Sequence, residues 1–130
     1  LLTEFETRFD GCADCHIFMN LGMRPQAKSF HPHWDQGPTY IMQMDGETRW
    51  VVYENRASAL LPSTEDYPYV PCQEELTIQL DTVLKRGDVL YLPQRKFHKA
   101  YPTKKRLSIS VPIWCPKRCE CSDRNSYQLF

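Results

Sequence analysis

The chain has 130 residues, which suffice for one domain with a proper hydrophobic core but not for two. Its 16 basic and 16 acidic side chains give no net charge, which argues against nucleic-acid binding through bulk electrostatics. No apolar run approaches the roughly 20 residues of a membrane span, and no signal peptide is visible at Leu1. Because the first residue is Leu rather than Met, we expect a processed chain or an excised piece, so missing targeting signals exclude little.

The first ten residues carry a helical pattern, and the rest reads as strands and turns. Apolar residues at helix-like spacing predict a short helix over Leu1–Asp10. Prolines and short β-branched or aromatic runs favour β structure from Cys15 onward, with Asn55–Gln73 as a long loop over one end of the fold. The expected strands are Ile17–Leu21, Ser29–Asp35, Thr39–Met44, Glu47–Tyr53, Leu76–Leu80, Val89–Leu92, Lys96–Tyr101 and Arg106–Ile113. About eight short strands with such frequent turns predict a sandwich or a jelly-roll barrel.

Asp45-Gly46, between two strand-like runs, predicts a β-hairpin with a two-residue turn. In that register Gln43 lies opposite Thr48, and Ile41 lies opposite Trp50. These four side chains then share one face, and the bulk of Ile41 and Trp50 indicates that this face looks inward. Thr48 is accordingly expected inside and Arg49 outside, with the reverse assignment left open.

His33-Trp34-Asp35, followed much later by His98, is the most informative pattern in the chain. Residues at i and i+2 of a strand point to the same face, so His33 and Asp35 can reach one metal ion together. Two histidines and one carboxylate, with the other positions open, are typical of non-heme Fe(II) oxygenases. A His31/His33 pair is a rival ligand set of simpler cupin type. That pattern requires a Glu a few residues later, and Gln36-Gly37-Pro38 offers none. A site without metal is the remaining alternative.

Three motifs resemble the JmjC and ribosomal-oxygenase branch of the cupin superfamily. They are FHPHWD at Phe30–Asp35, the run YIMQMDGETRW at Tyr40–Trp50, and the LKRGDVLYLP segment at Leu84–Pro93 that leads to His98. The resemblance implies an all-β double-stranded β-helix with a short N-terminal helix. It also implies that Fe(II) is bound by His33, Asp35 and His98, and that 2-oxoglutarate is the cosubstrate, converted to succinate as the prime substrate is hydroxylated.

The chain departs from this family at the residue that usually pairs with the distal carboxylate of 2-oxoglutarate. Thr48 occupies the position where the family has an inward Lys or Arg. Arg106-Leu107-Ser108 resembles the Arg-x-Ser on the last strand of other 2-oxoglutarate oxygenases, and a guanidinium suits a carboxylate and stays charged when buried. The candidate cosubstrate-binding residues are therefore Arg106, Ser108, Thr48 and Tyr40, with a solvated charge as the alternative for Arg106. His16 is assigned a structural role.

The chain contains six cysteines, which could bind a metal ion or form disulfides. In a double-stranded β-helix the first and last strands are antiparallel neighbours, so cysteines that flank them should converge at one corner. A structural Zn site is expected there, drawn from Cys12, Cys15, Cys115, Cys119 and Cys121, with disulfides as the competing interpretation. Cys72 is expected to be a free thiol. The organisation that follows is a core over 1–114 and a Cys-rich tail over 115–130 that packs back on it.

The predicted function is an Fe(II)- and 2-oxoglutarate-dependent dioxygenase that hydroxylates a protein side chain or a small molecule. The alternatives are a non-catalytic metal-binding cupin module and a cupin dioxygenase that works without 2-oxoglutarate. Neither a nucleic-acid partner nor membrane association is expected, the oligomeric state is left open, and the expected location is intracellular, in the cytoplasm or nucleus.

Overall fold

The computed structural model describes residues 1–22, 29–57, 75–102 and 104–114. Helix α1 (Leu2–Phe9) confirms the predicted helix and ends at Asp10, whose backbone is left-handed with φ 51°. The strands are β1 (Cys12–Ala13), β2 (His16–Asn20), β3 (Thr39–Arg56), β4 (Ile78–Lys85), β5 (Val89–Leu92), β6 (Lys96–Tyr101) and β7 (Arg106–Trp114). All the strand pairings among them are antiparallel.

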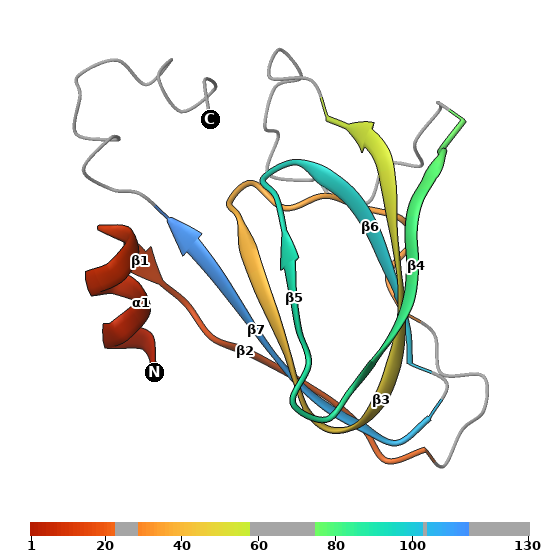
Figure 1. Ribbon diagram of the computed structural model, residues 1–130, viewed down its shortest axis with the longest axis horizontal. Coiled ribbons are helices and arrows are strands. Elements are labelled where there is room, and N and C mark those ends of the chain that lie inside the picture. Colours follow the sequence, from red (N-terminus) through yellow and green to blue (C-terminus); the bar gives the residue numbers. More distant parts are fainter. Residues whose placement is uncertain (23–28, 58–74, 103, 115–130) are drawn as a thin grey trace.

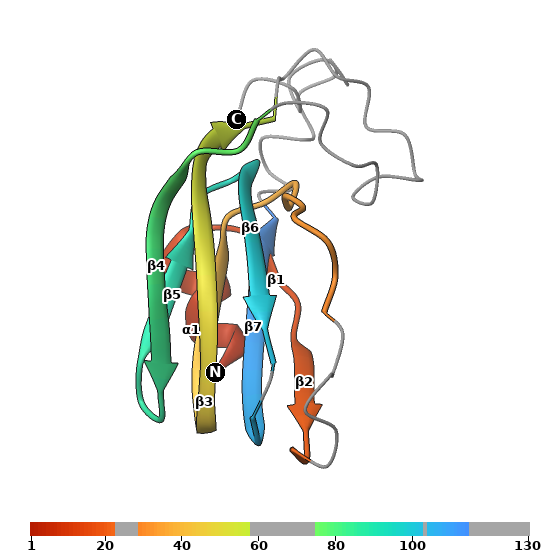
Figure 2. The ribbon, with the colours of Figure 1, turned by 90° about the vertical axis from the view of Figure 1, so that its right-hand side faces the viewer.

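The long strand β3 belongs to two facing sheets. Its first half pairs with β5 on one side and β7 on the other, and β2 continues beyond β7; we call this the first sheet. Its second half pairs with β4 and β6, which form the second sheet. Figures 1 and 2 show that β3 bends between its first half in the first sheet and its second half in the second sheet. From β4 to β7 the chain alternates between the sheets, which confirms the expected double-stranded β-helix.

The predicted hairpin at Asp45-Gly46 is wrong, because both residues lie within β3, directly after an irregularity in its pairing with β7 between Gln43 and Asp45. Gly46 has φ 65°, and a Cβ there would overlap the carbonyl oxygen of Lys105. The extra residue shifts the alternation of side chains, as a two-residue turn would also have done. For this reason Thr48 and Trp50 are buried and Arg49 is exposed. These orientations agree with the prediction, although the hairpin from which they were predicted does not exist.

Of the other predicted strands, some match the observed strands and others do not. Val89–Leu92 and Lys96–Tyr101 match β5 and β6, and β7 extends one residue beyond its prediction. The predicted strand Ser29–Asp35 is wrong: this segment is a loop, with one isolated bridge from His33 to His98. β4 starts later and runs longer than Leu76–Leu80, because polar residues on its exposed side hid its extent. Most of the expected Asn55–Gln73 loop lies outside the described residues, and β3 includes its first two positions.

Two apolar clusters stabilise the fold, one between the two sheets and one outside the second sheet. The cluster between the sheets consists of Ile41, Trp50, Val52, Leu84, Leu90, Leu92 and Ala100. The other lies on the outer side of the second sheet, where Trp34 of the 29–38 loop packs with Val51, Tyr53, Ala57 and Phe97. Trp34 therefore anchors the loop that carries His33 and Asp35.

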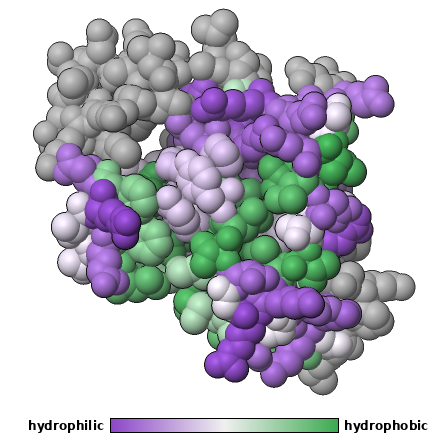
Figure 3. All heavy atoms as spheres, viewed as in Figure 1, coloured by the Kyte–Doolittle hydropathy of each residue, from purple (hydrophilic) through white to green (hydrophobic). Residues whose placement is uncertain are grey.

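Apolar side chains also reach the surface. Figure 3 shows them in a belt across the middle of the view, with hydrophilic atoms above and below. Within the ranges that the structure describes, no helix has the length and apolar character needed to span a membrane.

Candidate functional site

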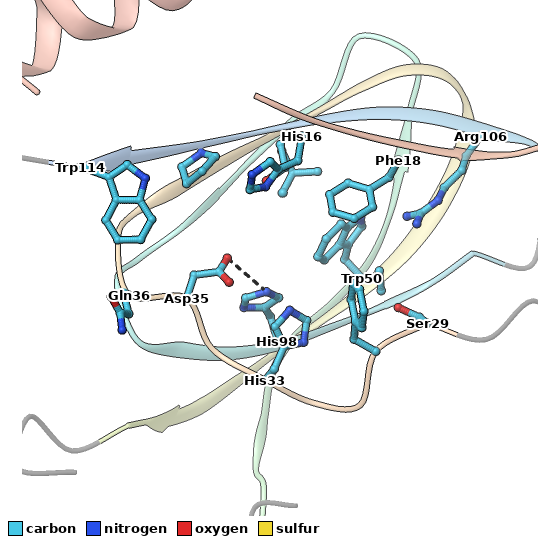
Figure 4. Close-up of a pocket in the computed structure, with 16 residues that line it drawn as sticks. His16, Phe18, Ser29, His33, Asp35, Gln36, Trp50, His98, Arg106 and Trp114 are labelled. Atoms are coloured by element: carbon cyan, nitrogen blue, oxygen red, sulfur yellow. Dashed lines mark ion pairs between the residues drawn. The ribbon is translucent and has the colours of Figure 1, made fainter. Parts of the chain in front are cut away.

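His33, Asp35 and His98 lie together between the two sheets. Their potential ligand atoms are all within 4.8 Å of one another. His33 and Asp35 come from the 29–38 loop and His98 from β6, and Figure 4 shows the three side chains directed toward one another. The backbone of His33 donates to the His98 carbonyl oxygen (3.1 Å), and that of His98 donates to the His33 carbonyl oxygen (2.8 Å). Paired peptide groups thus fix two of the three side chains at adjacent positions.

Both imidazoles are oriented in the same way by the backbone. Nδ1 of His33 lies 2.9 Å from the His31 carbonyl oxygen, and Nδ1 of His98 lies 2.9 Å from the Lys96 carbonyl oxygen. A carbonyl oxygen only accepts, so each Nδ1 carries the proton and each Nε2 presents a free lone pair. This is the arrangement that metal-binding histidines adopt.

Asp35 is held from two sides. Its Oδ2 accepts a hydrogen bond from the Thr39 hydroxyl (3.2 Å) and lies 3.7 Å from Nε2 of His98. Its backbone carbonyl accepts from the Arg95 amide (2.8 Å), and Arg95 has a left-handed backbone with φ 62°. A non-glycine residue in this conformation stores strain, a feature that concentrates at functional sites.

Burial lowers the pKa of His98, and the nearby Asp35 carboxylate opposes this effect only in part. The neutral imidazole is therefore favoured, which is the form that binds a metal ion. Two imidazole Nε2 atoms and one carboxylate in this arrangement fit a divalent metal such as Fe(II). Among the described residues, the cluster that can share an ion consists of these three side chains and leaves out the exposed His31. The rival His31/His33 ligand set is thus not the one that the structure assembles.

A pocket of about 610 Å³ surrounds this cluster. In the view of Figure 4, Gln36 and Trp114 lie toward one end, and Phe18 and Arg106 lie toward the other. His16 lines the opposite wall, on β2, with Nε2 3.5 Å from Oδ2 of Asp14. The three clustered residues therefore divide the pocket into two ends of different chemistry, one of which holds a guanidinium.

Arg106 is the first residue of β7. Its side chain points into the pocket, and the residue is only 9% exposed. Its guanidinium carbon lies 5.7 Å from the centre of the Phe18 ring. Burial lowers the pKa of this guanidinium, and its Nε has no hydrogen-bond partner within the described part of the chain. A buried cation with unused donors is costly unless an anion completes it, so this end of the pocket fits a carboxylate.

The other candidate cosubstrate residues are placed differently. Thr48 is buried and its hydroxyl lacks a partner among the described residues, but it is not part of the pocket lining. Ser108 also lies outside the lining, because its hydroxyl donates to Oε1 of Gln43 (2.9 Å) beside the irregularity in β3. Tyr40 is also absent from the pocket lining: it alternates with the inward Thr39 and Ile41, so its ring faces outward.

Helix α1 covers the outward ring of Tyr40. The ring centre lies 5.3 Å from that of Phe5 and 5.4 Å from that of Phe9. Sequence reasoning instead missed His16, Phe18, Gln36 and Trp114 as pocket residues. His16 and Phe18 occupy the inward side of β2, whereas the sequence pattern indicates the opposite, because the apolar residues that alternate with them, Ile17 and Met19, face outward.

The cysteines can be located only in part. β1 pairs with β7 in the register Cys12 to Trp114, so Cys12 lies beside the residue that precedes Cys115. Cys12 is exposed and Cys15 is partly buried. Cys72, Cys115, Cys119 and Cys121 lie outside the described residues, and the zinc site, its disulfide alternative and the packing of residues 115–130 stay predictions.

The donor set, the fold and the pocket define a jelly-roll protein with a candidate metal centre, and the sequence comparison specifies the family. Residues 3–120 match the JmjC domain, so the chain belongs to the JmjC family of Fe(II)- and 2-oxoglutarate-dependent oxygenases. It is 34% identical over 90 residues to the bifunctional lysine-specific demethylase and histidyl-hydroxylase NO66 of Drosophila willistoni, a match that covers 68% of this chain and 12% of that protein. The NO66 protein of Dictyostelium discoideum is 32% identical over 103 residues, covering 77% and 19%.

Solved structures agree with this assignment. The structure of Escherichia coli YcfD is 26% identical and superposes with a TM-score of 0.60, covering 77% of this chain and 25% of that one. A further YcfD structure, described as a ribosomal oxygenase in complex with cobalt and 2-oxoglutarate, shares the fold at 22% identity and a TM-score of 0.61, covering 86% and 27%. The chain thus spans a small part of the length of these relatives.

Proposed function

We propose that this chain is an Fe(II)- and 2-oxoglutarate-dependent oxygenase that hydroxylates a protein side chain or a small molecule. The observation that carries this proposal is the buried, incompletely paired guanidinium of Arg106 in the same pocket as the His33, Asp35 and His98 cluster. A metal site alone fits many cupins, whereas a metal site with a nearby carboxylate-binding group suits a dicarboxylate cosubstrate. The names of the NO66 and YcfD relatives favour a protein side chain as prime substrate.

Each residue has a separate task in this reaction. His33 and His98 offer Nε2 lone pairs, and Asp35 supplies the negative charge that offsets part of the metal charge. Arg106 donates hydrogen bonds to the distal carboxylate and thereby orients the cosubstrate. Bound iron supplies the chemistry that activates O₂. Overall, 2-oxoglutarate, O₂ and a substrate C–H group yield succinate, CO₂ and the hydroxylated substrate, with one oxygen atom entering each oxidised product.

Anaerobic titration with Fe(II) tests the proposal directly. Addition of 2-oxoglutarate to the iron-loaded protein should produce a weak visible charge-transfer band. Arg106→Ala should weaken the band at a fixed 2-oxoglutarate concentration, whereas Arg49→Ala should leave it unchanged, because Arg49 lies outside the barrel and pairs with Asp81 (Nε to Oδ1, 2.8 Å). Iron binding without any band at saturating 2-oxoglutarate would reject the cosubstrate assignment.

A non-catalytic metal-binding cupin is the second candidate, and Thr48 is the feature that favours it. The loss of the basic residue at this position would follow if 2-oxoglutarate were no longer used. Conversion of 2-oxoglutarate to succinate by the iron-loaded protein under air distinguishes the two candidates, because uncoupled turnover requires a competent site even without the prime substrate. Stable iron binding with no succinate formed would favour the binding module.

A further inference from the structure

Trp50 is a pocket residue whose indole donor is not used within the described part of the chain. It lies in the second half of β3, is only 6% exposed, and contributes to the lining of the pocket around the metal cluster. Its Nε1 is shielded from solvent and has no hydrogen-bond partner among the described residues. An indole N–H can only donate, and a buried indole usually finds an acceptor. The unused donor therefore indicates a place where a ligand supplies the acceptor.

Unused polar atoms gather at the end of the pocket that holds Arg106. Within the described ranges, the buried side chains with such atoms are Thr48, Trp50, Arg95 and Arg106. Thr48 and Trp50 alternate along β3 and share its inward face, and Arg106 pairs with Gly46, two residues before Thr48. Arg95 lies apart from these three, between β5 and β6 and outside the pocket lining. Because buried polar groups in native proteins are rarely left unpaired, this concentration marks a binding site.

The chemistry at this end of the pocket suits an anion. Nε1 of Trp50 and Nε of Arg106 are both donors, and the guanidinium adds a positive charge. Among the described lining residues, Asp35 is the only acid, and it belongs to the metal cluster. The ring of Phe18 makes the wall beside Arg106 apolar. A carboxylate that accepts from both donors would therefore form charge-assisted hydrogen bonds in surroundings of low polarity, where such bonds are strong.

Trp50 and Arg106 approach the pocket from different sheets. Arg106 is the first residue of β7 in the first sheet, whereas Trp50 pairs with Ala100 of β6 in the second sheet. The centre of the Trp50 ring lies 6.0 Å from that of His98, and in the view of Figure 4 Trp50 lies between His98 and Arg106. A ligand that extends from the metal cluster to the guanidinium would therefore pass Trp50. The two donors can then bind the same carboxylate from two sides.

Packing holds the indole in place before any ligand arrives. Trp50 belongs to the apolar cluster between the sheets, together with Ile41 and Ala100. A donor that is already fixed loses little conformational entropy when its acceptor binds. A site built to hydrogen-bond one group also discriminates against an analogue that lacks this group, because its buried donors then stay unpaired. The placement of Trp50 thus favours both affinity and selectivity for a ligand with a carboxylate at this end.

We propose that Trp50 donates a hydrogen bond through Nε1 to the distal carboxylate of 2-oxoglutarate, opposite Arg106, and thereby selects oxo acids that carry this second carboxylate. The inference rests on the proposed function and adds a second donor to it. Thr48, where the family has a basic residue, lies two positions before Trp50 on the same face of β3. The chain thus replaces one basic residue on β3 by two donors, a neutral one on β3 and a charged one on β7.

Trp50→Phe tests this inference, because it keeps an aromatic ring in the cluster and removes the N–H donor. The variant and the wild-type protein are titrated anaerobically, in the Fe(II) form, with 2-oxoglutarate and with 2-oxobutyrate, which has the same oxo-acid group but lacks the distal carboxylate. The Kd of 2-oxoglutarate should rise at least about tenfold, as expected for the loss of a hydrogen bond to a charged group, and that of 2-oxobutyrate should stay within about twofold. Trp114→Phe is the matched control, because it removes the same kind of donor at the other end of the pocket and should leave both constants within about twofold.

Nuclear magnetic resonance of the wild-type protein gives a second readout that requires no turnover. The Zn(II)-loaded protein is diamagnetic, so the indole N–H signals of its three tryptophans can be followed, and Trp34→Phe and Trp114→Phe identify the Trp50 signal by elimination. 2-Oxoglutarate should move the Trp50 proton signal downfield and slow its exchange with solvent, because a hydrogen bond to a carboxylate forms. 2-Oxobutyrate should do neither.

The outcomes separate this inference from the proposed function on which it rests. A wild-type protein that binds Fe(II) but not 2-oxoglutarate would reject the proposed function. Normal binding of 2-oxoglutarate with an unchanged Trp50 signal would overturn the role of Trp50 alone. Weaker binding of both oxo acids by the same factor in Trp50→Phe would do so too, since it would make Trp50 a packing residue. If Trp50→Phe fails to fold, the signal of the wild-type protein decides.

Discussion

Replacing Arg106 by methionine should have opposite effects on stability and on cosubstrate binding. In the metal-free protein, the guanidinium is buried, its Nε has no hydrogen-bond partner among the described residues, and its carbon lies 5.7 Å from the centre of the Phe18 ring. Replacing buried ionic groups by apolar side chains of similar size is often stabilising by about 1–4 kcal/mol. The lost cation–π contact costs about 0.5–1 kcal/mol. We therefore expect the variant to be more stable by about 1–2 kcal/mol and its Tm to rise by about 3–8 °C.

The same substitution should nearly abolish the binding of 2-oxoglutarate. Truncating one partner of a buried, hydrogen-bonded charge pair costs about 2–5 kcal/mol, so the Kd of 2-oxoglutarate should rise at least about thirtyfold. Arg106→Lys should fall between wild type and Arg106→Met, since it keeps the charge but loses the planar fork.

Two assays measure these effects separately. Thermal unfolding of the metal-free protein followed by circular dichroism gives the stability, and anaerobic titration of the Fe(II) protein gives the affinity. Arg49→Met is the control, because its exposed guanidinium pairs with Asp81 outside the pocket. A metal-free Arg106→Met protein that is less stable than wild type, with 2-oxoglutarate affinity within threefold of wild type, would show that Arg106 is an ordinary structural residue.

Further predictions concern the metal ligands, the irregularity in β3 and pH. Asp35→Asn should weaken Fe(II) binding at least about a hundredfold, measured by anaerobic titration, because it removes the negative ligand; unchanged affinity would exclude Asp35 from the ligand set. Gly46→Ala should destabilise the protein by about 2–4 kcal/mol in urea unfolding, because its Cβ meets the Lys105 backbone, whereas Gly87→Ala, with φ 94° and open space, should cost about 1 kcal/mol. The lowered pKa of His98 means that the unfolded chain binds the proton more readily than the folded one. Stability of the metal-free protein should thus fall as the pH drops below 6.5, and His98→Gln should flatten that dependence; an equally steep decline in the variant would assign it to other groups.

Sequence patterns predicted the chemistry of the site better than its backbone. His33, Asp35 and His98 were expected together because their residue types match a known ligand set, yet the strand expected to carry the first two is a loop. The loop places both side chains correctly because paired hydrogen bonds with His98 and the burial of Trp34 fix it, and both are tertiary contacts. Local periodicity cannot show such contacts.

The Asp45-Gly46 pair shows a different limit. A left-handed glycine serves a tight turn and a strand irregularity equally well, and both shift the alternation of side chains by one. The inward and outward faces were therefore predictable, but the partner strands were not. What decides between them is the approach of the Lys105 backbone and the pairing of Gln43 with Gly87 and Asp88 through the main chain. Tyr40 was misplaced because its own alternation with Ile41 was not applied to it.

The reciprocal hydrogen bonds between His33 and His98 tie the movement of the loop to the integrity of the site. The 29–38 loop cannot lift from β6 without separating two ligands, so local opening and loss of the ion become a single event. The amide protons of these two residues should accordingly exchange with solvent at a rate set by metal occupancy, slow in the loaded protein and fast after chelation. Two amides can thus serve as an internal gauge of whether the centre is assembled, without any knowledge of the substrate.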